Sequence, residues 1–130
     1  MKCLDTDLLI AMLRGKEEAT KKVTEIDAES KGATTAINAF EIFFGAHKSA
    51  RKSENVKEAS KLLDRLEVIP LDFASSRRAS EISAKLMTKG ETIDYRDAMI
   101  AGIAIENDLV LVTRNKSHFN RIKDLKWEIW

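Results

Sequence analysis

The stretch Thr92–Asn115 constrains the fold of this chain more than any other part of the sequence. Ala98–Ile105 is a run of eight residues with no polar side chain, and a helix that is apolar all round is a buried helix. Leu109–Val112 then predicts a short buried strand. Polar side chains occur only at the ends of this unit, which makes those ends the first places to look for a site.

The rest of the chain alternates in the same way between apolar strands and helices. Further strands are predicted at Met1–Leu4, Ala33–Ala36 and Val68–Leu71, with an edge strand at Trp127–Trp130. Helices are predicted at Asp7–Leu13 with Thr6 as its cap, at Lys16–Asp27, at Ile37–Lys48, from Ser53 or Asn55 to Arg65, and at Phe73–Lys89 capped by Asp72. Pro70 suits an edge strand or a strand end. Such alternation with short loops predicts an α/β fold, a three-layer sandwich around a mainly parallel sheet, as a single domain over residues 1–130.

The charge balance argues against a protein that holds nucleic acid on a broad basic face, because such proteins are usually more basic. Lys and Arg number 22 and Asp and Glu 21, a formal net charge of +1, so any nucleic-acid contact should be local. The single cysteine, Cys3, excludes an intrachain disulfide and is expected to pack in the first strand. No apolar run reaches the ~18 residues of a membrane span, so we expect no membrane segment and a cytoplasmic location.

Acidic and hydroxyl side chains follow the strands that should lie at the centre of the sheet. Asp5 follows the first strand, and Thr113 and Asn115 follow the strand at Leu109–Val112. Ligands of open parallel sheets bind at the carboxyl ends of the strands. Asp94 and Asp97 begin the buried helix, and each is equally compatible with a capping role or a role in the site. Asp94 is the better cap, which leaves Asp97 for chemistry.

Glu41 is an acidic residue in an apolar helix segment, Phe40-Glu41-Ile42-Phe43-Phe44. A buried carboxylate needs a partner, because burial without one raises its pKa or destabilises the fold. One possibility is an ion pair with Arg or Lys. The other is a divalent cation held jointly by Glu41, Asp5 and Asp97, since hard cations such as Mg²⁺ prefer oxygen ligands and need only a few carboxylates. Such a cation generates hydroxide and neutralises charge on a phosphoryl group.

Taken together, these residues resemble the PIN-domain ribonuclease family, and most closely its VapC-type toxins. The resemblance spans nearly the whole chain and rests on three segments in order: Leu4-Asp5-Thr6-Asp7, Asn38-Ala39-Phe40-Glu41-Ile42-Phe43-Phe44-Gly45-Ala46, and Asp97-Ala98-Met99-Ile100-Ala101 followed by Leu111-Val112-Thr113-Arg114-Asn115 and Phe119. Each segment alone is a weak signal, whereas their order and spacing are fairly specific.

The resemblance implies that Asp5, Glu41 and Asp97 are the catalytic residues and bind Mg²⁺ or Mn²⁺. Thr6 and Thr113 match the family's hydroxyl positions, with Asp94 and Asn115 in supporting places. A further acid common after the last motif is missing, because Asn115 and His118 stand at its two candidate positions. Asn38 also stands where Thr or Ser is common. With that acid missing, a second metal ion is expected to be held weakly or only with substrate present.

The implied activity is hydrolysis of RNA phosphodiester bonds by a metal-activated water. The family further implies a homodimer and inhibition by a VapB-like antitoxin, whose tail covers the acidic pocket. Four basic side chains near the acids are candidates for RNA phosphate contacts, although each is at least as well explained as a solvated charge or a salt bridge: Arg14, Arg96, Arg114 and Lys116.

Two other functions are compatible with the sequence. One is a metal-dependent phosphatase or phosphoacceptor with Asp5 as its nucleophile, and the other is a non-catalytic binding module with a PIN-like fold. His47 and His118 are expected to be surface or packing residues rather than bases, and Trp127 and Trp130 to cover the core. Phe40, Phe43 and Phe44 are expected in the core or, if exposed, in a dimer interface.

Overall fold

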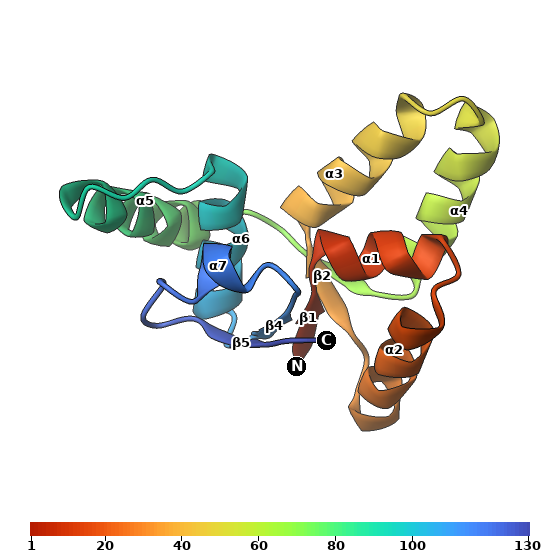
Figure 1. The fold of residues 1–130 in the computed structure, drawn as a ribbon, viewed down its shortest axis with the longest axis horizontal. Coiled ribbons are helices and arrows are strands. Elements are labelled where there is room, and N and C mark those ends of the chain that lie inside the picture. The colour runs from red at the N-terminus through yellow and green to blue at the C-terminus, as the bar shows by residue number, and fades with distance from the viewer.

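The computed structural model describes all residues, 1–130, around a five-stranded sheet whose neighbouring strands are all parallel, in the order β3-β2-β1-β4-β5 (Figure 1). The strands are β1 (Lys2–Leu4), β2 (Ala33–Thr35), β3 (Glu67–Ile69), β4 (Val110–Val112) and β5 (Lys126–Glu128). The helices are α1 (Thr6–Leu13), α2 (Glu17–Glu29), α3 (Ala36–His47), α4 (Lys52–Asp64), α5 (Phe73–Thr88), α6 (Tyr95–Glu106) and α7 (Lys116–Phe119). This confirms the predicted α/β sandwich, and the sheet is parallel throughout.

The helices cover the two faces of the sheet in two groups, α1 to α4 on one side and α5 to α7 on the other (Figure 1). The alternation of side chains along each strand produces this division. Cys3 and Leu111 belong to the apolar core beneath α5 and α6, whereas their neighbours Leu4 and Val112 belong to the core beneath α1 to α4. Both faces of the central strands are therefore buried, which is why these strands are short continuous apolar runs.

The helix α6 is the buried element that the sequence predicts. Its residues Ala98 and Ile100–Ala104 are buried, and it packs closely against α5. Gly102 makes this approach possible, because a Cβ at that position would lie 2.6 Å from the carbonyl oxygen of Ser75 and 3.0 Å from the amide nitrogen of Ala79. No side chain fits there without a shift of the α5 backbone.

Most of the predicted element boundaries agree with the structure to within a few residues, including the edge positions of β3 and β5. Two differences concern the site. Thr6 is the first residue of α1 rather than its cap; Asp5 is the N-cap, and its side chain accepts from the Thr6 amide. The short helix α7 was not predicted, because four residues are too few to show a helical period. None of the helices combines the length and the apolar character that a membrane span needs.

Candidate acidic site at the carboxyl edge of the sheet

The sequence order of the strands reverses between β1 and β4, and the candidate site lies at the carboxyl ends of these two strands. From β1 the chain moves outward to β2 and β3, and it then crosses back to add β4 and β5 on the other side. Crossovers of opposite direction leave a crevice at such a point. Asp5 follows β1 and Thr113 follows β4, and the Asp5 amide continues the ladder by donating to the Val112 carbonyl at 3.1 Å.

Asp5 is the most deeply buried acid of the site, with an exposed fraction of 3%. Its Oδ1 accepts from the Thr6 amide at 2.9 Å and the Asn38 side-chain amide at 3.0 Å, and its Oδ2 accepts from the Thr113 hydroxyl at 2.7 Å. All of these donors are neutral. Burial raises the pKa of Asp5 to about 6, against the lowering effect of the Thr113 hydrogen bond. No cation of the protein compensates this carboxylate.

Asn38 and Thr6 connect Asp5 to Glu41. The side-chain amide of Asn38 donates to Thr6 Oγ1 at 2.8 Å, and the Thr6 hydroxyl donates to Glu41 Oε1 at 2.8 Å. Asn38 itself is fixed by the capping box at the start of α3, where it exchanges hydrogen bonds with Thr35. The side chains of Asp5, Thr6 and Glu41 therefore form one hydrogen-bonded chain anchored on a completely buried amide.

The N-terminus of α6 contributes two acids to the same edge. Asp94 is the N-cap and accepts from the Arg96 amide at 2.8 Å, which confirms its capping role. The Arg96 guanidinium also contacts both Asp94 and Glu41, at 3.1 Å and 3.5 Å. Asp97 lies within 3.0 Å of His118 Nδ1. Burial raises the pKa of Asp97, and His118 opposes this while Asp94 and Glu41 add to it.

Glu41 pairs with Arg96, which is one of its two predicted alternatives, whereas the contact of His118 with Asp97 was not predicted. His118, expected to be a surface or packing residue, is half-exposed but directly contacts Asp97 from α7. Glu41 retains 23% of its side-chain exposure, and it is not enclosed by aromatic residues. Phe40 and Phe44, one turn apart on α3, are exposed and stack on each other with ring centroids 5.9 Å apart. Because of the helical period, Phe40 and Phe44 point away from the core in which Ile42 packs.

Asp7 is a further acid of this region that the sequence analysis did not single out. Its Oδ2 accepts from the Arg114 amide at 2.8 Å and is 3.3 Å from the Thr113 hydroxyl, and its Oδ1 accepts from the Trp130 indole at 3.0 Å. Arg114 in turn stacks on the Trp130 ring at 3.6 Å and pairs with Glu18. The C-terminal residue thus fixes the loop after β4. The sequence carries no signal that singles out Asp7, because an acid in the first turn of a helix is common.

The remaining predicted site residues lie around this edge, and some of them are engaged in ion pairs while others are not. Arg96 and Arg114 are already paired with acids, whereas the side chains of Arg14 and Lys116 are exposed and make no ion pair. The Asn115 amide donates to Thr113 Oγ1 at 3.0 Å, and its side chain caps nothing.

The side chains present supply the oxygen donors that a hard cation prefers, although they are not drawn together around one point. No three acid, histidine or cysteine side chains lie close enough to hold an ion jointly. Arg96 lies against Glu41 and His118 lies against Asp97, so each basic group occupies a place that a cation would compete for. Asp5 alone has no basic partner. The donor types therefore suit a divalent cation, whereas their present arrangement, with Arg96 and His118 on two of the acids, does not surround one.

Comparison with known proteins places this arrangement in a family. The model of the PIN domain family matches residues 2–125. Among curated proteins, the tRNA(fMet)-specific endonuclease VapC of Salmonella typhimurium is 32% identical over 127 residues, covering 98% of this chain and 96% of the relative. The ribonuclease VapC2 of Rickettsia felis is 30% identical over 128 residues, with the same coverage of both chains.

Solved structures agree with these relatives. A chain of the VapBC2 complex of Rickettsia felis, bound to a DNA fragment from its promoter, superposes with a TM-score of 0.92 at 28% identity, covering 99% of this chain and 98% of that one. A chain of the DNA-bound VapBC complex of Salmonella typhimurium superposes with a TM-score of 0.90 at 30% identity, covering 100% and 99%.

Proposed function

Because this chain belongs to the PIN-domain family, with VapC ribonucleases as its relatives, we propose that it is a metal-dependent endoribonuclease and the toxin of a toxin–antitoxin pair. Its reaction is hydrolysis of RNA phosphodiester bonds. Mg²⁺ or Mn²⁺ is the proposed ion, because the available donors are carboxylate and hydroxyl oxygens.

The buried carboxylate of Asp5 is the observation that carries this proposal. Asp5 is 3% exposed, accepts hydrogen bonds only from neutral groups and has a pKa raised to about 6 by burial. A buried charge without a countercharge costs folding free energy, and proteins retain such groups mainly where a ligand or a reaction needs them. Its position at the switch point of the sheet is also where ligands of open α/β sheets bind.

Asp5, Glu41 and Asp97 are the proposed metal ligands and catalytic residues. When bound, the ion supplies an activated water and neutralises charge on the phosphoryl group. Thr113 and Asn38 orient the two oxygens of Asp5, and Thr6 orients Glu41 through its hydroxyl. Asp94 holds the first turn of α6 and thereby positions Asp97. These neutral donors orient Asp5 and Glu41 without neutralising them, and the basic groups on Glu41 and Asp97 are Arg96 and His118.

The alternative of a phosphoacceptor with Asp5 as nucleophile fits the structure less well. A phosphoacceptor needs a basic side chain to hold the phosphoryl group beside its nucleophile, and all of the groups that contact the Asp5 carboxylate are neutral. The non-catalytic alternative is favoured by one observation, the pairing of Arg96 with Glu41 and of His118 with Asp97. If those pairs persist in the presence of metal, the chain binds RNA or a partner without cleaving it.

The test is cleavage of a tRNA transcript by the purified protein in the presence of Mg²⁺ or Mn²⁺, with Asp5→Asn as the inactive control. We expect cleavage that EDTA abolishes and that excess Mn²⁺ restores. Calorimetric titration with Mn²⁺ supplies a second readout, with a binding isotherm for the wild type and none for Asp5→Asn. Activity that survives either the substitution or EDTA would contradict the proposal. An absence of Mn²⁺ binding at millimolar concentration would favour the non-catalytic module.

The proposed partner is a VapB-like antitoxin that binds between α1, α3 and α4. A cavity of about 250 Å³ there is lined by Ile10, Leu13, Ile42 and Ala46, and Glu41 lies at its border. Apolar side chains of a partner segment would fill this cavity, and a basic side chain would reach Glu41 in place of Arg96. The exposed stack of Phe40 and Phe44 on the same helix adds apolar surface for a partner or for a second copy of the chain.

Substitution Leu13→Glu tests this partner surface, because Leu13 lines the cavity, is 40% exposed and takes no part in the acidic site. Coexpression with a VapB-like antitoxin should give a complex that Leu13→Glu disrupts while RNA cleavage persists. A complex that forms equally well with the variant would place the partner elsewhere. Size-exclusion chromatography with light scattering on the free chain tests the proposed homodimer.

A further inference from the structure

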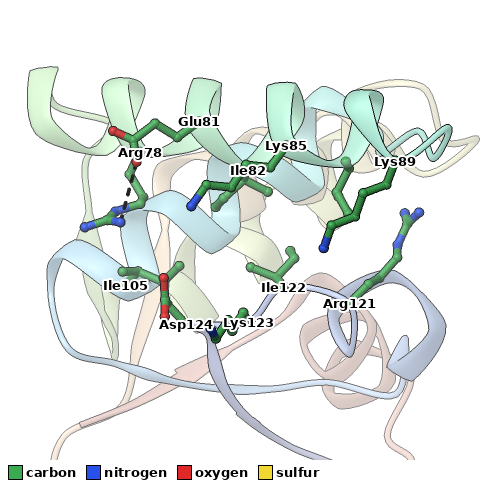
Figure 2. A pocket seen from close by; sticks show the side chains of 11 residues that line it. Arg78, Glu81, Ile82, Lys85, Lys89, Ile105, Arg121, Ile122, Lys123 and Asp124 are labelled. Atoms are coloured by element: carbon green, nitrogen blue, oxygen red, sulfur yellow. Dashed lines mark ion pairs between the residues drawn. The ribbon is translucent and has the colours of Figure 1, made fainter.

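A second cavity lies outside the acidic site, on the opposite group of helices. It has a volume of about 240 Å³ and is bordered by α5, the end of α6 and the segment after α7. Figure 2 shows Lys89 extending from α5 toward the segment that carries Arg121 and Ile122, while Lys85 extends along α5 toward Arg78. Its apolar lining consists of Ile82, Leu86, Ile105 and Ile122, and its border is mainly basic.

The basic side chains of this cavity are only partly compensated. Arg78 is paired with Glu81 and Glu106, and Arg121 is paired with Glu91. The three lysines, Lys85, Lys89 and Lys123, make no ion pair with the protein. Asp124 is the one acid in the lining that likewise has no basic partner. The unpaired charges therefore give the rim of the cavity a net positive charge, while its interior lining is apolar. Such a cavity matches an anionic ligand that also has an apolar or aromatic part.

The cavity is connected to the acidic site through α7. His118 contacts Asp97, and three residues later the Arg121 guanidinium donates to the His118 carbonyl at 3.4 Å while lining the cavity. Arg121 also pairs with Glu91, which lies just before the first turn of α6. A ligand that spans α7 would thus reach the acids with one part and the lysines with another.

We propose that this cavity binds a nucleotide unit of the RNA substrate away from the cleaved bond, with a base against the isoleucines and leucine and its phosphate on the lysines. The proposal rests on the ribonuclease function proposed above. A volume of 240 Å³ is just below the ~300–1,000 Å³ of typical small-molecule sites, which suits a single base rather than a longer segment. Lysines act as mobile point charges for phosphates, and bases stack or pack on apolar surfaces without sequence readout.

The test uses the triple variant Lys85→Gln/Lys89→Gln/Lys123→Gln, which removes three charges and no ion pair of the native protein. Binding of a tRNA transcript is measured by fluorescence anisotropy in Mg²⁺, in an Asp5→Asn background that does not cleave, over a series of salt concentrations. A matched control is Lys21→Gln/Lys31→Gln/Lys57→Gln, three exposed lysines on the other helix group that also make no ion pair. Thermal melting verifies that both variants fold.

We expect about ten-fold or greater weakening of binding by the cavity variant, with a salt slope smaller by about one, because the lysines hold one phosphate and each lost phosphate contact removes roughly 0.7–0.9 from the slope. A short oligonucleotide that cannot span α7 should be cleaved at the wild-type rate in the cavity variant without Asp5→Asn. The control variant should change binding and slope less than the cavity variant does.

Three results would overturn the proposal. The first is an equal affinity and an equal salt slope for the cavity variant and the wild type. If the wild type cleaves RNA, this result leaves the ribonuclease function intact. An equal loss in the control variant would attribute the effect to net charge alone. A wild type that binds no RNA would remove both proposals together.

Discussion

Replacement of Asp5 by asparagine should stabilise the metal-free protein at neutral pH, although it removes the proposed central ligand. Burial raises the pKa of Asp5 from its ordinary 3.8 to about 6. At about 1.4 kcal/mol per pKa unit, keeping this carboxylate ionised at pH 7 costs roughly 3 kcal/mol of folding free energy. The Asp5→Asn variant has no charge at this position and would avoid this cost.

The hydrogen bonds around Asp5 allow the substitution. The side-chain oxygen of the introduced asparagine can still accept from the Thr6 amide and from Asn38, which both contact the same oxygen of Asp5. The new amide group would face Thr113 Oγ1, which lies 2.7 Å from Asp5 Oδ2 in the wild type. The Thr113 hydroxyl could then accept from this amide and donate to Asp7, whose Oδ2 is 3.3 Å away. The second N–H of the new amide has no acceptor among these contacts, so the 3 kcal/mol calculated above is an upper limit.

The sign of the pH dependence follows from the raised pKa. The folded wild type binds a proton at Asp5 more tightly than the unfolded chain does, so this contribution to stability is complete below pH 3.8 and is lost as pH rises through about 6. The advantage of Asp5→Asn should therefore be near zero at pH 4 and reach at most about 3 kcal/mol at pH 7, a rise in Tm of at most about 10 °C.

Differential scanning fluorimetry between pH 4 and pH 7.5 in EDTA measures this difference, with the exposed Asp64→Asn as the control that should show none. Adding Mn²⁺ at ten times its Kd should stabilise the wild type by about 1.4 kcal/mol and leave Asp5→Asn unchanged. An Asp5→Asn protein that is less stable than the wild type at pH 7, or a difference that does not vary with pH, would refute this reasoning.

Three further substitutions test neighbouring contacts. Arg96→Gln removes the cation that competes at Glu41, so Mn²⁺ affinity measured by calorimetry should rise by up to about five-fold, the range of an exposed ion pair; weaker binding would show that Arg96 supports the site. Trp130→Phe removes the indole hydrogen bond to Asp7 and should cost about 1 kcal/mol in urea unfolding, whereas an unchanged midpoint would make that contact irrelevant. Gly102→Ala inserts a Cβ against the α5 backbone and should cost about 1–3 kcal/mol, and a neutral effect would mean that α5 can shift freely.

The sheet and the buried helix could be predicted from the sequence because their patterns are local. Ala98–Ile105 has no polar side chain, and the central strands are apolar on both faces, which the structure explains by burial on both sides of the sheet. The helix α7 escaped prediction because Lys116–Phe119 is too short for a period. The cap of α1 was assigned to Thr6 instead of Asp5, since both residue types cap helices and only the backbone distinguishes them.

The site could be predicted only in part, because most of its contacts join residues that are distant in the sequence. The ends of strands placed Asp5 and Thr113 at one edge of the sheet, and they are indeed joined by a hydrogen bond. The partners of Asp97 and Glu41, namely His118 and Arg96, depend on how α7 and α6 approach the sheet, which no local pattern records. Asn38 could have been found, because Thr35 and Asn38 stand at the spacing of a capping box.

The central claim is that Asp5, Glu41 and Asp97 hold one divalent cation at the carboxyl edge of the sheet. Anomalous diffraction from crystals grown with Mn²⁺ tests it most directly. We predict a manganese peak in contact with Asp5 and Asp97, with Glu41 bound directly or through water and with Arg96 and His118 turned away from the acids. Crystals saturated with Mn²⁺ that show no peak there, and in which Arg96 and His118 remain on Glu41 and Asp97, would contradict it.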